Sequence, residues 1–233
     1  MLHIWNISGQ EVAAFPVEAK VQETEFQKHL QVHELKRRLE SFCGLPRFRQ
    51  RLVHEDGTLL DDHDMLRPSA VQLVLLAFCP TSASQAAELV DAARSGMTST
   101  VELLLQRPQD PNLGNPAPLL FAADNGHLEV ARLLVEAGAD ANISENTVFN
   151  DATPLILACQ NGHFQVARLL LRAKADVDKA DLDDVTPLHL ACHYGHLQVT
   201  QLLLEAEAVV DKSRSVAGSR PAARVQGKPG EDG

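Results

Sequence analysis

The chain has 233 residues, of which 45% are hydrophobic, so it can form one or two domains with packed cores. Its formal net charge is −10, and residues 80–211 hold 18 Asp and Glu against 7 Lys and Arg. A field of that sign repels nucleic acid and favours a protein partner with a basic or mixed-charge surface.

The sequence shows no targeting or membrane segment. The first ten residues lack a charged stretch followed by an apolar run, and the best apolar run, residues 71–78, has the length of a strand. We therefore expect no membrane contact. The cysteines are far apart and form no CxxC pair, which indicates a reducing compartment, the cytoplasm or alternatively the nucleus: Cys43, Cys79, Cys159 and Cys192.

Residues 1–79 are predicted to form an α+β domain. Two apolar segments around Ser8-Gly9 are typical of a β-hairpin, and further strands are expected at residues 50–53 and 71–77. Residues 30–43 form the one predicted helix, with Leu35, Leu39 and Phe42 at helical spacing. The order ββαββ predicts a sheet wrapped over one helix.

The second half of this domain resembles ubiquitin in the order and spacing of its motifs: Gly44-Leu-Pro46, Gln50-Arg-Leu-Val53, Asp56-Gly57, Thr58-Leu59-Leu60-x-Asp62 and Ser69-x-Val71-Gln-Leu-Val-Leu75. The resemblance implies a β-grasp fold with an apolar receptor-binding patch at Ile7, Val53 and Val74. No Gly-Gly follows the last strand, so we expect a built-in module that is not conjugated to other proteins.

Residues 86–211 contain four copies of one pattern. In each copy a short apolar segment, a Gly turn and a second apolar segment follow one another, and the turn glycines Gly96, Gly126, Gly162 and Gly195 are spaced by 30, 36 and 33 residues. With Thr186-Pro-Leu-His-Leu-Ala-Cys-His-Tyr-Gly-His196 and its echoes, the pattern resembles the ankyrin repeat. The resemblance implies an all-α ankyrin repeat solenoid with units 86–112, 116–142, 150–178 and 183–211.

Each copy carries the signals of two short helices. Thr153 and Thr186 are predicted N-caps, the Pro after each belongs to a first helical turn, and the Gly supplies a positive φ. The first copy lacks Thr-Pro, as an N-terminal cap would. The third copy is three residues longer within Ser144–Asp151, which predicts a protruding finger, meaning the loop that enters a unit.

The histidines and cysteines that could bind a metal or act in catalysis are better explained by structural roles. His189, His193 and His196 flank Cys192 at spacings that zinc ligands also use. Two of these histidines, however, occupy repeat positions, and Cys192 echoes the small-residue packing site Cys159. No Cys/His/Asn arrangement, phosphate loop or EF-hand is present. We therefore predict that the protein binds no metal or cofactor and is not an enzyme.

The ankyrin resemblance also implies a concave binding surface, formed by the inner helices near their ends and by the fingers. Transferred by register, it comprises Asp124, Asn125, Gln160, Asn161, His193 and Tyr194 from the helices and Asn146, Phe149, Asp181, Asp183 and Asp184 from the fingers. Phe149 and Tyr194 are the expected aromatic anchors.

The predicted function is that of a monomeric, non-enzymatic scaffold. The ankyrin units would bind a client protein and the ubiquitin-like module a second partner. Two alternatives stay open: an adaptor that brings clients to the proteasome or a ubiquitin ligase, or a piece of a larger enzyme. Residues 212–233 are rich in Gly, Pro, Ser and basic residues and are predicted to be disordered. No polar capping unit follows the fourth copy, so Leu202, Leu203, Val209 and Val210 are expected at an open end or inside a longer product.

Overall fold

The computed structural model describes residues 2–6, 11–15, 31–54, 56–66, 70–145 and 148–208. Several sequence-based predictions fall outside these ranges: those for Ile7, Asn146, Val209, Val210 and the tail 212–233. No helix in the described ranges has the length and apolar character needed to cross a membrane.

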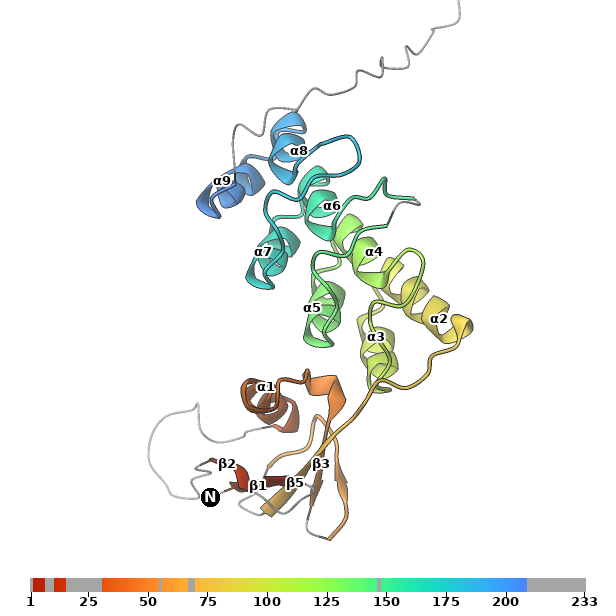
Figure 1. The fold of residues 1–233 in the computed structure, drawn as a ribbon, viewed down its shortest axis with the longest axis vertical. Helices are drawn as coiled ribbons and strands as arrows, with labels where there is room; N and C mark the ends of the chain where they lie inside the picture. The colour runs from red at the N-terminus through yellow and green to blue at the C-terminus, as the bar shows by residue number, and fades with distance from the viewer. Residues whose placement is uncertain are drawn as a thin grey trace, which may run out of the picture.

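The N-terminal part, here called the sheet domain, is a small mixed sheet covered by one helix (Figure 1). The sheet order is β2-β1-β5-β3-β4; β1 pairs with β5 in parallel, and the other pairs are antiparallel. The elements are β1 (Leu2–Asn6), β2 (Glu11–Phe15), α1 (Val32–Cys43), β3 (Gln50–His54), β4 (Leu59–Leu60) and β5 (Ala70–Leu75), with a short 3-10 helix η1 (Arg47–Arg49) before β3. The predicted hairpin, helix and two later strands are present, and β4 is an additional short strand.

The core of the sheet domain lies between α1 and one face of the sheet. Leu35 and Leu39 of α1 pack against side chains from three strands, among them Ile4, Leu52 and Leu73. Phe42 was expected on the same helical stripe, but 60% of its surface is exposed. At the last turn of the helix Cys43 packs against the core in place of Phe42.

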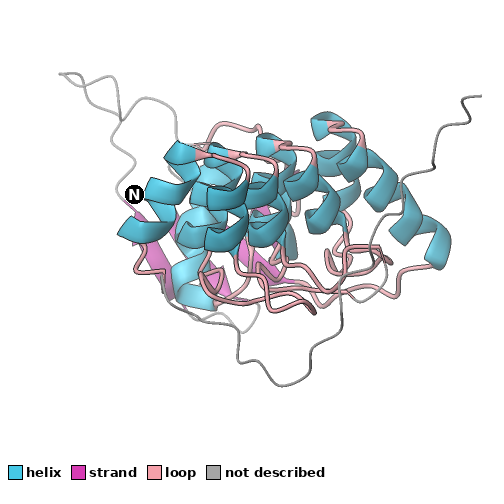
Figure 2. Ribbon diagram, turned by 90° about the horizontal axis from the view of Figure 1, so that it is seen from above, coloured by secondary structure: helices cyan, strands magenta, loops and turns pink. Residues whose placement is uncertain are grey.

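The C-terminal part, here called the helical array, contains four described helix pairs. The first helices of the pairs form one row and the second helices another (Figure 1). Each helix packs on its partner and on its equivalent in the next pair. Figure 2 shows the connecting loops gathered along one side of the array. The pairs are α2 (Ala83–Arg94) with α3 (Thr98–Leu105), α4 (Pro118–Asp124) with α5 (Leu128–Glu136), α6 (Pro154–Gln160) with α7 (Phe164–Arg172), and α8 (Pro187–His193) with α9 (Leu197–Glu205).

Side-chain caps mark the starts of α2, α6 and α8. The Thr153 and Thr186 hydroxyls accept hydrogen bonds from the third residue of α6 and α8, as predicted. Helix α2 begins at Ala83, earlier than the expected start of the first unit at residue 86. Its start is set by a capping box in which Ser82 and Gln85 satisfy each other's backbone N–H groups.

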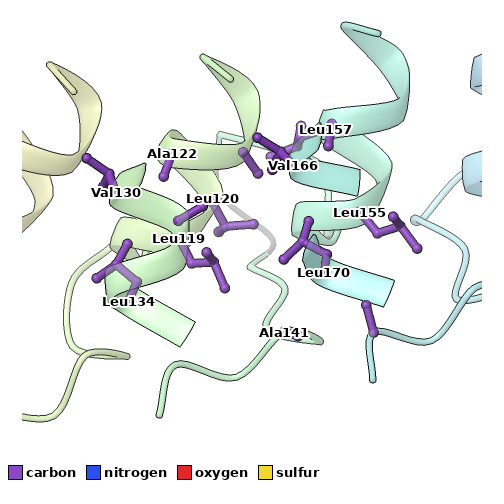
Figure 3. Close-up of a cluster of buried hydrophobic side chains, with 14 of the residues drawn as sticks. Leu119, Leu120, Ala122, Val130, Leu134, Ala141, Leu155, Leu157, Val166 and Leu170 are labelled. Carbon is purple, nitrogen blue, oxygen red and sulfur yellow. The ribbon is translucent and has the colours of Figure 1, made fainter. Parts of the chain in front are cut away.

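One apolar core runs through all four helix pairs. Figure 3 shows leucines such as Leu119, Leu134, Leu155 and Leu170 pointing between neighbouring helices, and buried alanines such as Ala122 belong to the same core. Burying one such leucine contributes about 1.5–3 kcal/mol. Because every pair shares this core with its neighbours, the array is stabilised by stacking.

A buried polar cluster joins the sheet domain to the helical array. Arg47 of η1 is only 3% exposed, and it donates hydrogen bonds to Asp62 Oδ2 (2.8 Å), Glu136 Oε2 (2.8 Å) and Glu102 Oε1 (3.3 Å). Lys36 Nζ lies 2.5 Å from the other oxygen of Asp62. Removing one partner from such a buried network leaves uncompensated charge, so the cluster holds the two parts in one arrangement.

Contacts around this cluster extend the interface. Phe48, next to Arg47, belongs to the core of the helical array, and Pro46 lies against Gly138. In the connecting segment, Cys79 N donates to Pro108 O at 2.7 Å. The two parts therefore share packing, hydrogen bonds and ion pairs.

Candidate protein-binding surface

Three histidine rings join successive helix pairs. The Nε2 atoms of His127, His163 and His196 donate to backbone carbonyls of the preceding pair, at 3.1 Å (Arg94), 3.0 Å (Asp124) and 3.0 Å (Gln160). Each ring also covers the turn glycine of that pair. The rings therefore have the structural role that their place in the Gly-His turn predicts.

The other residues of the suspected metal cluster have separate environments. His189 Nδ1 accepts from the Thr186 backbone N–H at 3.3 Å and so helps to cap α8. Within the described residues, no group of three His, Cys, Asp or Glu is placed to hold a metal. Cys159 is fully buried, and burial raises the pKa of its thiol to about 12. Cys192 was expected at an equally buried position, but it is exposed because no described helix pair packs over α8.

The predicted inner-helix residues lie in a row across successive units. Asn161 Nδ2 donates to Asp124 Oδ1 at 2.9 Å, and Asn125 Nδ2 donates to the Phe121 carbonyl of its own helix. Asn125 and Asn161 are exposed, whereas Asp124 and Gln160 are half-buried. These side chains therefore stabilise the turns and also present amide and carboxylate groups to solvent.

The acidic finger before α8 is an ordered turn. Asp181 Oδ1 accepts from the backbone N–H groups of Asp183 and Val185, both at 2.9 Å, so its carboxylate is occupied by its own loop. Asp183 accepts from Asn150 of the preceding finger at 2.8 Å. Asp183 and Asp184 are exposed and carry the negative charge of this finger.

The two predicted aromatic anchors differ in their packing. Tyr194 is 52% exposed, with its ring edge-on to His193 at 4.9 Å. Phe149 is half-buried and edge-on to Phe121 at 5.3 Å, so it attaches its finger to α4. The Arg94 guanidinium covers the same Phe121 ring at 4.0 Å. Of the two, only Tyr194 presents most of its ring to solvent.

The family comparison agrees with this architecture. The profile described as ankyrin repeats (three copies) matches residues 89–181 and, in a second match, residues 119–215, which together exceed half of the chain. The chain belongs to the ankyrin repeat family. A comparison with curated proteins finds no match. Ankyrin repeats generally mediate contacts between proteins, and the face formed by their fingers and inner helices is therefore the candidate site.

A hydrogen-bonded ladder that was not predicted from the sequence runs along the ankyrin fingers. The Asn112 side chain accepts from Asp140 N at 2.8 Å, and the Asn142 side chain accepts from Asp176 N at 2.7 Å. The signal was present in the sequence as an Asp-x-Asn pattern, at residues 110–112 and 140–142. The ladder fixes each finger to the next and gives the finger side of the array a defined shape.

A second apolar surface lies on the outer face of the sheet domain. Leu52, Val71 and Leu73 point into the core, so Val53 and Val74 lie on the opposite face and are half-buried. By the same alternation Trp5 (37% exposed) and Leu59 (54% exposed) lie on this outer face, although sequence analysis did not select them.

Proposed function

We propose that this protein is a non-enzymatic adaptor that binds one protein on its ankyrin array and another on its N-terminal module. We assign residues 1–79 to the ubiquitin-like β-grasp fold, supported by the strand order 2-1-5-3-4, the parallel β1–β5 pair and the single covering helix. We assign the ankyrin units to residues 86–112, 116–142, 150–178 and 183–211, with the first unit extended back to Ala83, where α2 begins. With four free thiols, the cytoplasm or nucleus is the proposed location.

The observation that carries this proposal is the exposed acidic and aromatic group in the last ankyrin unit. Asp183, Asp184 and Tyr194 are all exposed in one ordered unit, and the segment around them is strongly acidic. Aromatic side chains beside polar groups are frequent anchors of interfaces, and exposed charges speed association with a partner of opposite sign. The proposed site extends along Asp124, Asn125, Phe149, Gln160, Asn161, Asp181 and His193.

The outer sheet face supports the second binding function. Val53 and Val74, together with Trp5 and Leu59, give this face an apolar surface on the side opposite α1. Apolar patches rimmed by polar residues mark interaction sites more often than ordinary surface. This patch is the proposed contact for the second partner.

The test uses the full chain as bait, followed by binding kinetics on the captured partner at several salt concentrations. We expect association to slow as salt rises, because exposed charges are screened beyond about 8 Å at physiological ionic strength. Replacing Asp181, Asp183, Asp184 and Tyr194 together by Ala should weaken binding at least roughly tenfold.

A matched control removes three exposed carboxylates away from the fingers: Glu129, Glu205 and Glu207. This control changes the net charge equally but should alter the dissociation rate little. A partner that binds the finger variant and the wild-type chain equally well would show that this face is not the site.

A further inference from the structure

A hollow of about 620 Å³ lies beside α2, in the first ankyrin unit, where sequence analysis placed no binding residue. One helix face and the loop at residues 113–115 form its walls. Its size is in the range of roughly 300–1,000 Å³ that is usual for binding pockets. Half of the α2 side chains that line it are alanines, which leave the space open: Ala83, Ala86 and Ala87.

The next unit shows why this space is empty. Phe121 lies five residues before the turn glycine Gly126, and Phe149 lies four residues before the N-cap of α6. The centroids of their rings are 5.3 Å apart, and the two rings close the gap between the helix and the finger. At the equivalent positions the first gap has Asp91 and Leu113, and both residues line the hollow. Leu113 remains 41% exposed, so the smaller pair does not close the gap.

The walls define the chemistry of a ligand. The alanines, Val90 and Leu113 provide an apolar surface, and Asp91 places an exposed carboxylate beside it. The other charged group of the wall, Arg94, already covers the Phe121 ring. The rim therefore carries one charge of each sign, and among the described residues no cation pairs with Asp91, so its carboxylate remains available to a cation of a ligand.

We propose that this hollow receives a bulky apolar side chain, aromatic or leucine, from an extended segment of a partner protein, with a Lys or Arg of the same segment paired to Asp91. The ring of Phe149 fills the equivalent space in the next unit and shows the kind of group that fits. This inference rests on the proposed protein-binding function and assigns it a second contact, at the opposite end of the array from Tyr194.

The experiment selects random linear displayed peptides on the full chain and measures the Kd of the enriched peptides by fluorescence polarisation. We expect enrichment of one aromatic or leucine residue close to a Lys or Arg. Ala87→Leu places an isobutyl group in the hollow and should raise Kd about thirtyfold, the effect of losing an anchor. Ser84→Leu is the matched control, because Ser84 is exposed on α2 but does not line the hollow, and it should leave Kd unchanged.

A second pair of measurements tests the carboxylate. Asp91→Asn keeps the size of the side chain and removes its charge, so it should weaken a Lys-containing peptide about two- to fivefold and leave the same peptide with Gln in place of Lys unaffected. Circular dichroism and melting of each variant show that the array still folds.

The outcomes separate this inference from the proposed function. Peptides without an apolar anchor, no enrichment at all, or peptides that bind the Ala87→Leu variant as well as the wild type would overturn the assignment of the hollow. If those peptides are instead lost in the variant lacking Asp181, Asp183, Asp184 and Tyr194, the proposed function stands and only the hollow is wrong. Peptides that lose binding to the Ala87→Leu variant but bind the finger variant normally support the hollow as a contact separate from the finger site, which the partner kinetics test by themselves.

Discussion

Replacing Gly162 by Ala tests how strongly neighbouring ankyrin units are coupled. The new methyl group would lie 2.6 Å from Nδ1 and 2.7 Å from Cε1 of His196, far inside normal contact distance. Gly195 occupies the same turn in the next unit with nearly the same φ, +72° against +73°, but no described heavy atom lies within 4 Å of its Cβ position. The two substitutions thus share the backbone change and differ only in the ring contact.

The expected loss of folding free energy has a backbone part, common to both sites, and a ring-contact part at Gly162 alone. Holding a non-glycine residue at this positive φ costs about 1–2 kcal/mol at either site. At Gly162 the His196 ring must also move, which costs about 1–3 kcal/mol of overpacking and about 1 kcal/mol for its hydrogen bond to Gln160 O. We therefore expect Gly162→Ala to destabilise the protein by roughly 2–4 kcal/mol more than Gly195→Ala.

Urea unfolding followed by far-UV circular dichroism measures both losses, and hydrogen exchange in α8 and α9 locates them. A double-mutant cycle with His196→Ala should recover most of the extra cost, because without the ring the methyl group meets open space. Equal losses in the Gly162 and Gly195 variants would refute the view that these rings couple the units.

Three further predictions concern the buried groups. Arg47→Met should cost about 3 kcal/mol in urea unfolding, because it removes a buried cation shared by Asp62, Glu136 and Glu102, whereas Arg38→Met, at an exposed ion pair, should cost less than about 1 kcal/mol; similar costs would contradict a buried network. Burial pushes the pKa of Asp62 upward, but the neighbouring cationic side chains outweigh it and hold that pKa below its usual value. The charge therefore stabilises the fold above about pH 4, this contribution is lost as the pH falls through the lowered pKa, and Asp62→Asn should flatten the acid limb of a stability–pH curve. With its pKa raised to about 12, Cys159 should resist iodoacetamide at about pH 8 while exposed Cys192 is alkylated, as peptide mass spectrometry would show; equal labelling would contradict the burial.

The repeat architecture could be predicted from the sequence because its signals are local and recur. The Thr-Pro starts and the Gly-His turns each specify a few consecutive residues, and four copies in register reinforce one another. The start of α2 was also encoded locally, by Ser82 and Gln85, but aligning it with copies that begin with Thr-Pro concealed this different cap.

The parts that could not be predicted depend on distant residues. Arg47 and Glu136 are 89 positions apart, and no periodic pattern relates an arginine in a 3-10 turn to the end of a helix in another domain. The exposure of Cys192 likewise depends on what covers α8, not on the residues around it. The hollow beside α2 depends on how a helix residue, Asp91, and a finger residue, Leu113, fail to meet in space, and Leu113 lies outside the repeated segments of the sequence.

The Arg47 cluster holds the sheet domain and the helical array in a fixed relative orientation, unlike two domains joined by a flexible linker. Two domains on a flexible linker hold their bound partners at many different separations, so partners of many shapes can be bound at the same time. In the proposed adaptor, the rigid connection would hold two partners at one distance and one angle, so a second partner could bind only if its shape does not clash with the first. Selection between pairs of partners would then arise from the fixed angle itself, even when neither surface discriminates strongly alone.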